Sequence, residues 1–454
     1  MLPPPSHLEN LPIELLIHIN GSLPWDSRLA LASTSSNLRS SLAPLIFNSI
    51  KITSNTPGGQ DLERLVDTYG SLITRLHFVA SMSNGRPSDV LAPTSSGNGV
   101  PDQDDPSSQE SADNATRRFM TDLAHDALTG KLLPKVTTVC LSFDFDFESA
   151  EDVWDDPERV TAFPVSIWVF ADEETDDDVS MKEAKWPWRT LMAQTWSALC
   201  QNSSITELKV LNLIPKRTTT FGSDNWRDFL GCLDTLELRM WGGKSDFMFG
   251  NEANTLQGYL GFEAKLGEYF FRHLNQVQRL LLGAYLESPF GAREEGQGEH
   301  DIALPLSKEY LPRLRFLELH NIFVSKRLAD FVLSKGETLA EVRLHDCHAS
   351  TYDEMKISWA AFFTRLSKCQ LRDLHVTYEQ GDASAMIYDK GNRPKKENEE
   401  DEVFSYGELY VRGCFLVDAK KMCEKYEERR DLDAYRKLME LVSSNAKDVA
   451  QRYL

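Results

Sequence analysis

The densest group of side chains that could do chemistry is the run His345-Asp346-Cys347-His348, in which every residue can bind a transition metal. The alternation of the apolar residues just before this run places Cys347 in the interior and leaves the histidines in a loop. No second pair of ligands follows at the spacing that zinc sites use. We therefore expect no metal site and no bound cofactor.

Other catalytic patterns are equally weak. Gly97 and Gly99 lie in a polar segment with no predicted strand before them and no helix after them, unlike a phosphate-binding loop. The seven cysteines are scattered without a C-x-x-C pair, which is typical of reduced thiols in a cytoplasmic or nuclear protein. Catalytic Cys-His or Ser-His-Asp partners would meet only in the folded chain, so a soluble enzyme remains one hypothesis.

The charge balance argues against several classes of partner. The 454 residues include 49 Lys and Arg against 69 Asp and Glu, a formal net charge of −20. So acidic a surface repels phosphate groups, and we expect no binding to nucleic acid or to an anionic membrane. No apolar run reaches the roughly 18 residues of a membrane-spanning helix, and the N-terminus does not resemble a signal peptide.

Residues 144–178 hold fourteen acidic residues and one Arg. Such a run is usually a solvated face, and the alternative is a docking surface for a basic segment of a partner. Alternating apolar residues from Phe163 to Phe170 predict a strand inside it. Three other segments differ in composition from their surroundings: a Ser/Asn/Gly/Pro-rich stretch at 81–116 predicted to be disordered, a Gly/Glu-rich loop at 289–303 and a charged linker at 389–402.

The first fifty residues predict three short helices followed by an extended segment. The first helix opens at Leu11-Pro12, the second follows Leu23-Pro24, and the third begins near Ser36. Apolar residues at helical spacing are Leu15, Leu16 and Ile19 in the first helix, and Trp25, Leu29 and Leu31, predicted to face inward, in the second. So small a unit buries too little surface to be stable alone, and we expect it to dock on its own chain or on a partner.

These residues, in this order and spacing, resemble an F-box of the kind common in fungal proteins. The matching features are, in chain order, Leu11-Pro12 with Glu14, then Leu15, Leu16 and Ile19, then Leu23-Pro24, Leu29 and Leu31, Leu38, and the run from Pro44 to Phe47. Asn20 stands where the family often has an apolar residue, and Leu38 where it often has Trp. An F-box binds the Skp adaptor of cullin–RING ubiquitin ligases, called SCF complexes. The resemblance implies an adaptor-facing and core apolar surface made of Leu11, Pro12, Leu15, Ile19, Leu23, Pro24, Leu29 and Leu31.

Eight later segments share the pattern apolar-x-x-apolar-x-apolar, the strand signature of a leucine-rich repeat. They span residues 73–78, 136–141, 205–210, 233–238, 277–282, 314–319, 339–344 and 371–376. Only two of the intervals between them, 28 and 25 residues, match the usual period of about 20–29 residues, so the repeats are degenerate. Amphipathic helical stretches, such as 359–366, lie between the segments. Each strand–helix unit can bury its apolar face only against a neighbour.

We therefore predict an α/β protein with an N-terminal three-helix F-box (8–52), an irregular leucine-rich-repeat-like solenoid (53–388) and a C-terminal helical cap (403–454). The resemblance implies a non-catalytic substrate-recognition subunit of an SCF-type ligase, with the Skp adaptor and cullin at one end and a client protein at the other. The alternative is a non-ligase F-box scaffold. Strand alternation predicts the client surface at the solvent-facing positions Lys209, Glu237, Arg239, Glu318, His320, Arg343, His345, Asp373 and His375.

Overall fold

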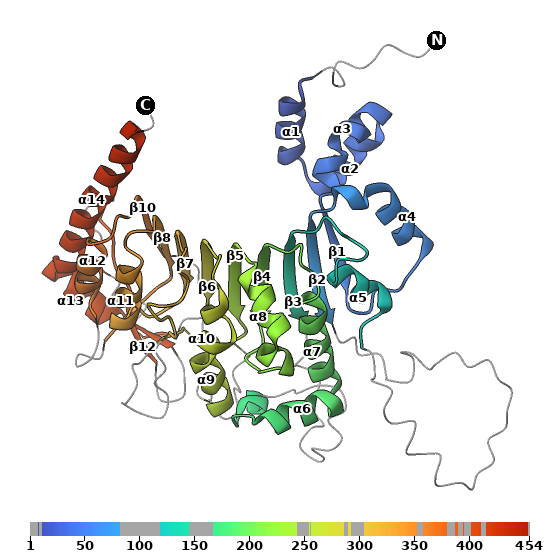
Figure 1. Ribbon diagram of the computed structural model, residues 1–454. Coiled ribbons are helices and arrows are strands. Elements are labelled where there is room, and N and C mark those ends of the chain that lie inside the picture. The colour runs from blue at the N-terminus through green and yellow to red at the C-terminus, as the bar shows by residue number, and fades with distance from the viewer. Residues whose placement is uncertain are drawn as a thin grey trace, which may run out of the picture.

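The computed structural model describes residues 8, 11–81, 119–144, 167–242, 254, 256–285, 289–291, 304–351, 357–378, 386–388, 394, 401–409 and 415–452. These residues form an α/β protein on one long parallel sheet, with short helices at its N-terminal end and further helices at its C-terminal end (Figure 1). None of the helices in these ranges is long and apolar enough to cross a membrane.

All eight segments with the repeated apolar pattern form strands of this sheet, and the residues after the third helix add a ninth. The nine strands pair in parallel, and their order in space follows their order in the chain. β1 and β10 are the two edges, so the sheet is open and does not close into a barrel. The strands are β1 (Ser49–Thr53), β2 (Arg75–Ser81), β3 (Thr138–Asp144), β4 (Glu207–Leu213), β5 (Thr235–Met240), β6 (Arg279–Gly283), β7 (Phe316–His320), β8 (Glu341–His345) and β10 (Asp373–Thr377).

Two rows of apolar side chains run across one face of the sheet and account for its register. Successive side chains of a strand alternate between faces, so the last two apolar residues of each pattern point the same way. Leu208 of β4 pairs with Val139 on one side and with Leu236 on the other. A slip of one residue would turn such a row into solvent. The first row is Ile50, Leu76, Val139, Leu208, Leu236, Leu280, Leu317, Val342 and Leu374.

Helices fill most connections between successive strands and pack on the apolar rows. The centre of this layer is aromatic: the Trp196 ring lies 5.5 Å from Phe143 of β3 and 5.4 Å from Trp226, centroid to centroid. The helices are α4 (Gln60–Tyr69), α5 (Asp122–Leu128), α6 (Asp176–Lys185), α7 (Pro187–Leu199), α8 (Asp224–Gly231), α9 (Gln257–Ala264), α10 (Leu266–Tyr269), α11 (Lys326–Ser334) and α12 (Trp359–Leu366), with 3-10 turns η1 (Gly70–Leu72), η4 (Ile167–Phe170), η5 (Thr219–Gly222) and η7 (Phe271–His273).

Three helices precede the sheet and stand above the strands at its β1 end (Figure 1): α1 (Ile13–Ser22), α2 (Trp25–Ser33) and α3 (Ser36–Ile46). They share a small apolar core of their own, separate from the main one, whose buried members are Leu16, Ala32, Leu38, Leu42 and Ile46. The Ser35 side chain caps α3 by accepting a hydrogen bond from the Leu38 backbone N–H. The Phe47 ring stacks on that of Tyr69 at 3.8 Å, which links the helices to α4.

A four-stranded sheet and two helices lie beyond the β10 edge. In spatial order its strands are β11 (Met386–Tyr388), β13 (Phe415–Asp418), β12 (Tyr406–Leu409) and β9 (Ala349–Ser350). Helices α13 (Ala419–Glu428) and α14 (Arg430–Arg452) follow, and α14 packs against α12 and β10. Residues 403–454, predicted to be a helical cap, thus also contribute two strands.

Asp401, predicted to lie in a charged linker, is fully buried. Its carboxylate accepts hydrogen bonds from the Arg429 and Arg436 guanidinium groups at 3.0 and 2.6 Å and from the Tyr426 hydroxyl at 3.0 Å. A buried carboxylate is tolerated when cations and donors surround it in this way. The end of the predicted linker is therefore an anchor for α13 and α14.

Most of the predicted insertions lie outside the described residues: 82–118, 145–166, 292–303 and 395–400. Within the acidic segment, Ile167–Phe170 was predicted to be part of a strand, and this prediction is wrong because these residues form the 3-10 helix η4. The Phe170 ring packs between those of Trp241 and Tyr259, 5.4 and 5.9 Å away. Aromatic packing in the helical layer therefore fixes this turn without a strand partner.

His348, expected in a loop, is buried where the small sheet meets the large one. Its ring lies 4.3 Å from that of Phe415, and its two nitrogens contact Ser405 Oγ at 2.8 Å and Asn321 Oδ1 at 3.2 Å. Burial lowers the pKa of His348 to about 3. The neutral imidazole is therefore part of the folded structure.

We expect this histidine to make the fold sensitive to acid. Because its folded pKa lies below the unfolded value of about 6.5, its contribution is complete above pH 6.5 and falls by up to about 1.4 kcal/mol per pH unit as the pH drops towards 3. Urea unfolding at pH 7 and pH 5 should show a steeper loss for the wild type than for His348→Gln. Equal losses in both proteins would contradict this.

Candidate interaction surfaces

Helices α1 and α2 expose more apolar side chains than any other part of the described chain. Ten large hydrophobic residues are exposed in the described ranges, and half of them lie on these two helices. We call this set the N-terminal apolar surface: Ile13, Leu15, Ile17, Trp25 and Leu29. Leu15 and Trp25 each expose about half of their surface, at 50% and 51%. Exposed apolar side chains concentrated on neighbouring helices mark a place where another surface binds.

The apolar surface follows from the composition of α1, which carries apolar residues around most of its circumference. Only Leu16 and Asn20 of α1 are buried, on the side that packs against α3. Three short helices enclose too small a core to bury more. The remaining apolar residues are left facing out. A helix that is apolar on more than one face normally buries both, so α1 is built for a second neighbour.

Asn20 is unusual in this small core. Its side chain is 3% exposed, and its Oδ1 atom accepts no hydrogen bond from the described residues. Burying an amide oxygen without a partner costs about 1–3 kcal/mol. Asn20 is also the position at which the F-box pattern more often has an apolar residue. Burial of its amide oxygen is the energetic cost of this difference from the pattern.

The eight residues predicted to form the adaptor surface divide into two groups, and none of them is fully buried. Pro12, Leu15, Pro24 and Leu29 are exposed, and the first and third precede α1 and α2 as N-caps. The other four, Leu11, Ile19, Leu23 and Leu31, are half-buried.

The orientation predicted for α2 is wrong. Trp25 and Leu29 were expected to face inward, and both are exposed, while Ala32 takes the buried position. Ile13 and Ile17, one helical turn apart, were not singled out in the sequence although their spacing marks a second apolar stripe. Arg28 was also missed: its Nε donates to Leu23 O at 2.8 Å and its Nη2 to Gly21 O at 3.1 Å, tying α2 to the end of α1.

The face of the large sheet opposite the helices carries the nine residues predicted as a client surface. They lie on β4, β5, β7, β8 and β10 at positions that alternate with the apolar rows. Strand register aligns them: Glu318 pairs with Arg343, His320 with His345, and Arg343 with His375. Most are half-exposed or exposed, whereas Glu237 is buried by the side chains around it. We call this surface the open face.

Charges on the open face are paired along and between strands. Glu237 contacts Arg239 at 2.6 Å and Lys209 at 3.7 Å, and Lys209 also contacts Glu207 at 3.1 Å. Arg343 Nη2 lies 2.6 Å from Glu341, and His375 lies 3.0 Å from Asp373. Half-exposed pairs of this kind are worth about 0–1 kcal/mol each. These ion pairs order the side chains of the open face. A ligand that breaks one of them to form its own contacts loses little free energy.

Phe316 is an aromatic centre on the open face that sequence reasoning missed. It begins β7 and is buried by two guanidinium groups, with Arg279 3.8 Å and Arg343 5.2 Å from its ring centroid. Arg279, Phe316 and Glu341 pair in register one row before the predicted positions. Alternation would have identified Phe316 and Glu341, because each lies two residues before a position that was chosen.

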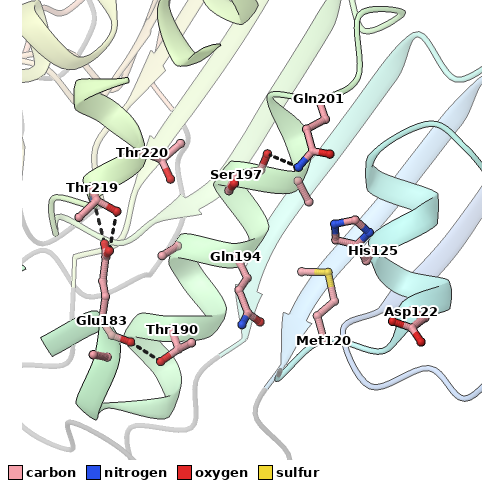
Figure 2. Close-up of a pocket in the computed structure, with 13 residues that line it drawn as sticks. Met120, Asp122, His125, Glu183, Thr190, Gln194, Ser197, Gln201, Thr219 and Thr220 are labelled. Atoms are coloured by element: carbon pink, nitrogen blue, oxygen red, sulfur yellow. Dashed lines mark hydrogen bonds between the residues drawn. The ribbon is translucent and has the colours of Figure 1, made fainter. Parts of the chain in front are cut away.

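A cleft of about 580 Å³ lies on the opposite side of the sheet, between α5 and α7. Figure 2 shows His125, Asp122 and Met120 facing Gln194, Ser197 and Gln201 across it. At its far end the Glu183 carboxylate accepts hydrogen bonds from the Thr219 N–H and hydroxyl at 2.9 and 2.6 Å. The hydrogen bonds of Glu183, Thr190 and Gln201 in the cleft secure helix ends and turns.

One carboxylate in the described part of the acidic segment, that of Glu174, is taken up by internal ion pairs. Glu174 is buried between Arg189, Lys216 and Lys182, at 2.9, 3.0 and 3.0 Å. Burial would raise the pKa of Glu174, but the adjacent Arg189 and Lys216 hold it below its usual value. Burial also lowers the pKa of Lys216 to about 8. Glu174 therefore stabilises the packing of α7. Because its side chain is buried, it cannot contact a docking partner.

The separate core of α1–α3 leads to a prediction about local stability. Leu15→Ser and Trp25→Ser should change the free energy of opening of these helices by no more than about 0.5 kcal/mol, because both side chains face solvent. Leu42→Ala should lower it by about 2–5 kcal/mol, because Leu42 is fully buried. Hydrogen exchange of the backbone amides of α1–α3 measures this difference. If Trp25→Ser lowered the free energy of opening as much as Leu42→Ala, Trp25 would be a core residue and not part of the exposed surface.

Two surfaces and one cleft thus stand out from the geometry. The N-terminal apolar surface lacks a neighbour among the described residues, the open face carries ordered polar side chains, and the cleft holds contacts that secure helix ends. Comparison with known proteins adds no identity to these features: no protein family model matches the chain, and no curated protein is similar to it.

Proposed function

We propose that this chain is a substrate-recognition subunit of an SCF-type cullin–RING ubiquitin ligase. In this proposal α1–α3 form an F-box that binds the Skp adaptor, and the open face holds a client protein. The chain would act by proximity, raising the effective concentration of client lysines near the ubiquitin-carrying enzyme. It would contribute no catalytic residue itself.

The observation that carries the proposal is the N-terminal apolar surface. Leu15 and Leu29 belong to the F-box pattern, and they are exposed together with Ile13, Ile17 and Trp25. Burying such residues at an interface contributes about 25 cal/mol per Å² of apolar surface, before the cost of association. A binding partner for α1 and α2 therefore explains why these helices keep apolar residues on their outer side.

The architecture supports the second half of the proposal. We propose that residues 53–388 form a leucine-rich-repeat-like solenoid, because eight strands with the repeated apolar pattern stack in chain order and their helices pack on the other face. Such arrays present an extended surface for binding other proteins. The adaptor surface and the open face belong to different elements, so the two partners would bind without competing.

The test is capture of the adaptor and cullin. The tagged chain is co-expressed with the Skp adaptor and a cullin, and the wild type is compared with Leu15→Glu/Trp25→Glu. A charge on either exposed position should weaken capture at least about tenfold, because a buried charge without a partner is costly at an interface.

The chain offers a matched control. Met181 and Leu333 are also exposed hydrophobic residues, but they lie on α6 and α11. Met181→Glu/Leu333→Glu should capture both partners as the wild type does. If the wild type binds neither partner while hydrogen exchange shows α1–α3 folded, the proposal fails. If it retains the adaptor without cullin, the non-ligase scaffold is the correct function.

A further inference from the structure

Two successive strands of the open face end in the same way. β7 ends at Leu319-His320 and is followed by Asn321, and β8 ends at Leu344-His345 and is followed by Asp346. Asn321 and Asp346 adopt left-handed backbone angles, φ 55° and 49°, which Asn and Asp tolerate better than most residues. The turn stops each strand directly after its histidine. Because the strands are in parallel register, His320 and His345 are direct neighbours.

The two imidazoles converge on one carboxylate. Their rings stack with centroids 4.5 Å apart and planes 25° from parallel. His320 Nε2 lies 2.7 Å from Glu318 Oε1, and His345 Nε2 lies 3.6 Å from the same oxygen. One ligand atom from each of the three residues lies within 4.8 Å of the others. In a tetrahedral zinc site, bond lengths of about 2.0–2.2 Å place ligand atoms roughly 3.3 Å apart.

The surroundings prepare the site for an ion. The second nitrogen of His345, Nδ1, lies 2.6 Å from Thr377 Oγ1 on the next strand. When Nδ1 donates its hydrogen to that hydroxyl, Nε2 carries a free lone pair 3.6 Å from Glu318 Oε1 and can bind a metal ion. Metal-bound histidines are usually oriented by such an outer hydrogen bond. The side chains of Glu318, His320 and His345 are 15–27% exposed, so an ion can reach them from solvent.

We propose that Glu318, His320 and His345 bind one divalent transition-metal ion, with zinc as the best fit to two imidazoles and a carboxylate. The ion takes the place of the hydrogen shared between His320 and Glu318. Its remaining coordination position faces the solvent above the open face, where water or an oxygen, nitrogen or sulfur ligand of a bound molecule completes the site. The site does not depend on the proposed ligase role.

The experiment uses the full chain, freed of metal with a chelator, and Co²⁺ or Zn²⁺ alone as the probe. Co²⁺ in a site of this kind absorbs visible light, and Zn²⁺ should displace it. We expect saturable binding of a single ion and a rise in melting temperature with Zn²⁺, because the ion binds only the folded state. His320→Gln and His345→Gln should abolish the Co²⁺ absorption, and Thr377→Val should weaken binding about 10–100-fold.

His375 provides a matched control on the same face. It pairs with Asp373 at 3.0 Å as His320 pairs with Glu318, but its partner in register on β8 is Arg343 and not a histidine. His375→Gln should bind the ion as the wild type does. The proposal is overturned if the wild type binds no ion, if the His320→Gln/His345→Gln variant binds it equally well, or if His375→Gln lowers the affinity as much. The metal-free melting temperature of each variant shows that it is folded.

Discussion

The in-register stacking of apolar side chains in the parallel sheet is the constraint on which the rest of the structure depends. No strand with its helix can bury Leu208 or Leu236 alone, so each unit is stable only between two neighbours. The register that aligns these leucines also determines every other row of the sheet. The aromatic residues of the helical layer, with the edge-to-face pair Trp196 and Trp226 at its centre, fill the space that the connections enclose.

In the part of the chain that the structure describes, that constraint leaves the other face of the sheet without a helical layer. Side chains there alternate with the buried rows, and the same register that aligns leucines inside aligns His320 with His345 outside. Ion pairs such as Arg239–Glu237 then order the surface without neutralising it. Outward-facing residues of such a sheet can be substituted one at a time without changing the apolar core on its other face.

The two edges of the sheet are covered in different ways. At the β10 edge, α14 and the small sheet cover the last strand, and Asp401 and His348 are buried there with full sets of polar partners. At the β1 edge, α1–α3 enclose only a small core and present Leu15 and Trp25 to solvent. The C-terminal end is closed within the chain, while the N-terminal end remains suited to a partner.

The sequence by itself determined where the strands of the large sheet lie and which of their residues point to the face opposite the apolar rows. All eight repeated segments are strands, because the apolar pattern and the two-residue alternation are local properties. The three N-terminal helices were also predictable from their spacing and prolines. The inward direction predicted for Trp25 and Leu29 was wrong, because the side of α2 that is buried depends on where α3 packs.

Only the tertiary structure decided which distant residues meet. Glu318, His320 and His345 come from two strands, and their convergence follows from parallel register, which no spacing in the chain reveals. The strands β12 and β13 formed inside a predicted helical cap because partners from residues 349–350 and 386–388 lie beside them. Local patterns set the direction of each side chain relative to its own strand or helix, whereas contacts between elements depend on free energy that only the assembled chain can gain.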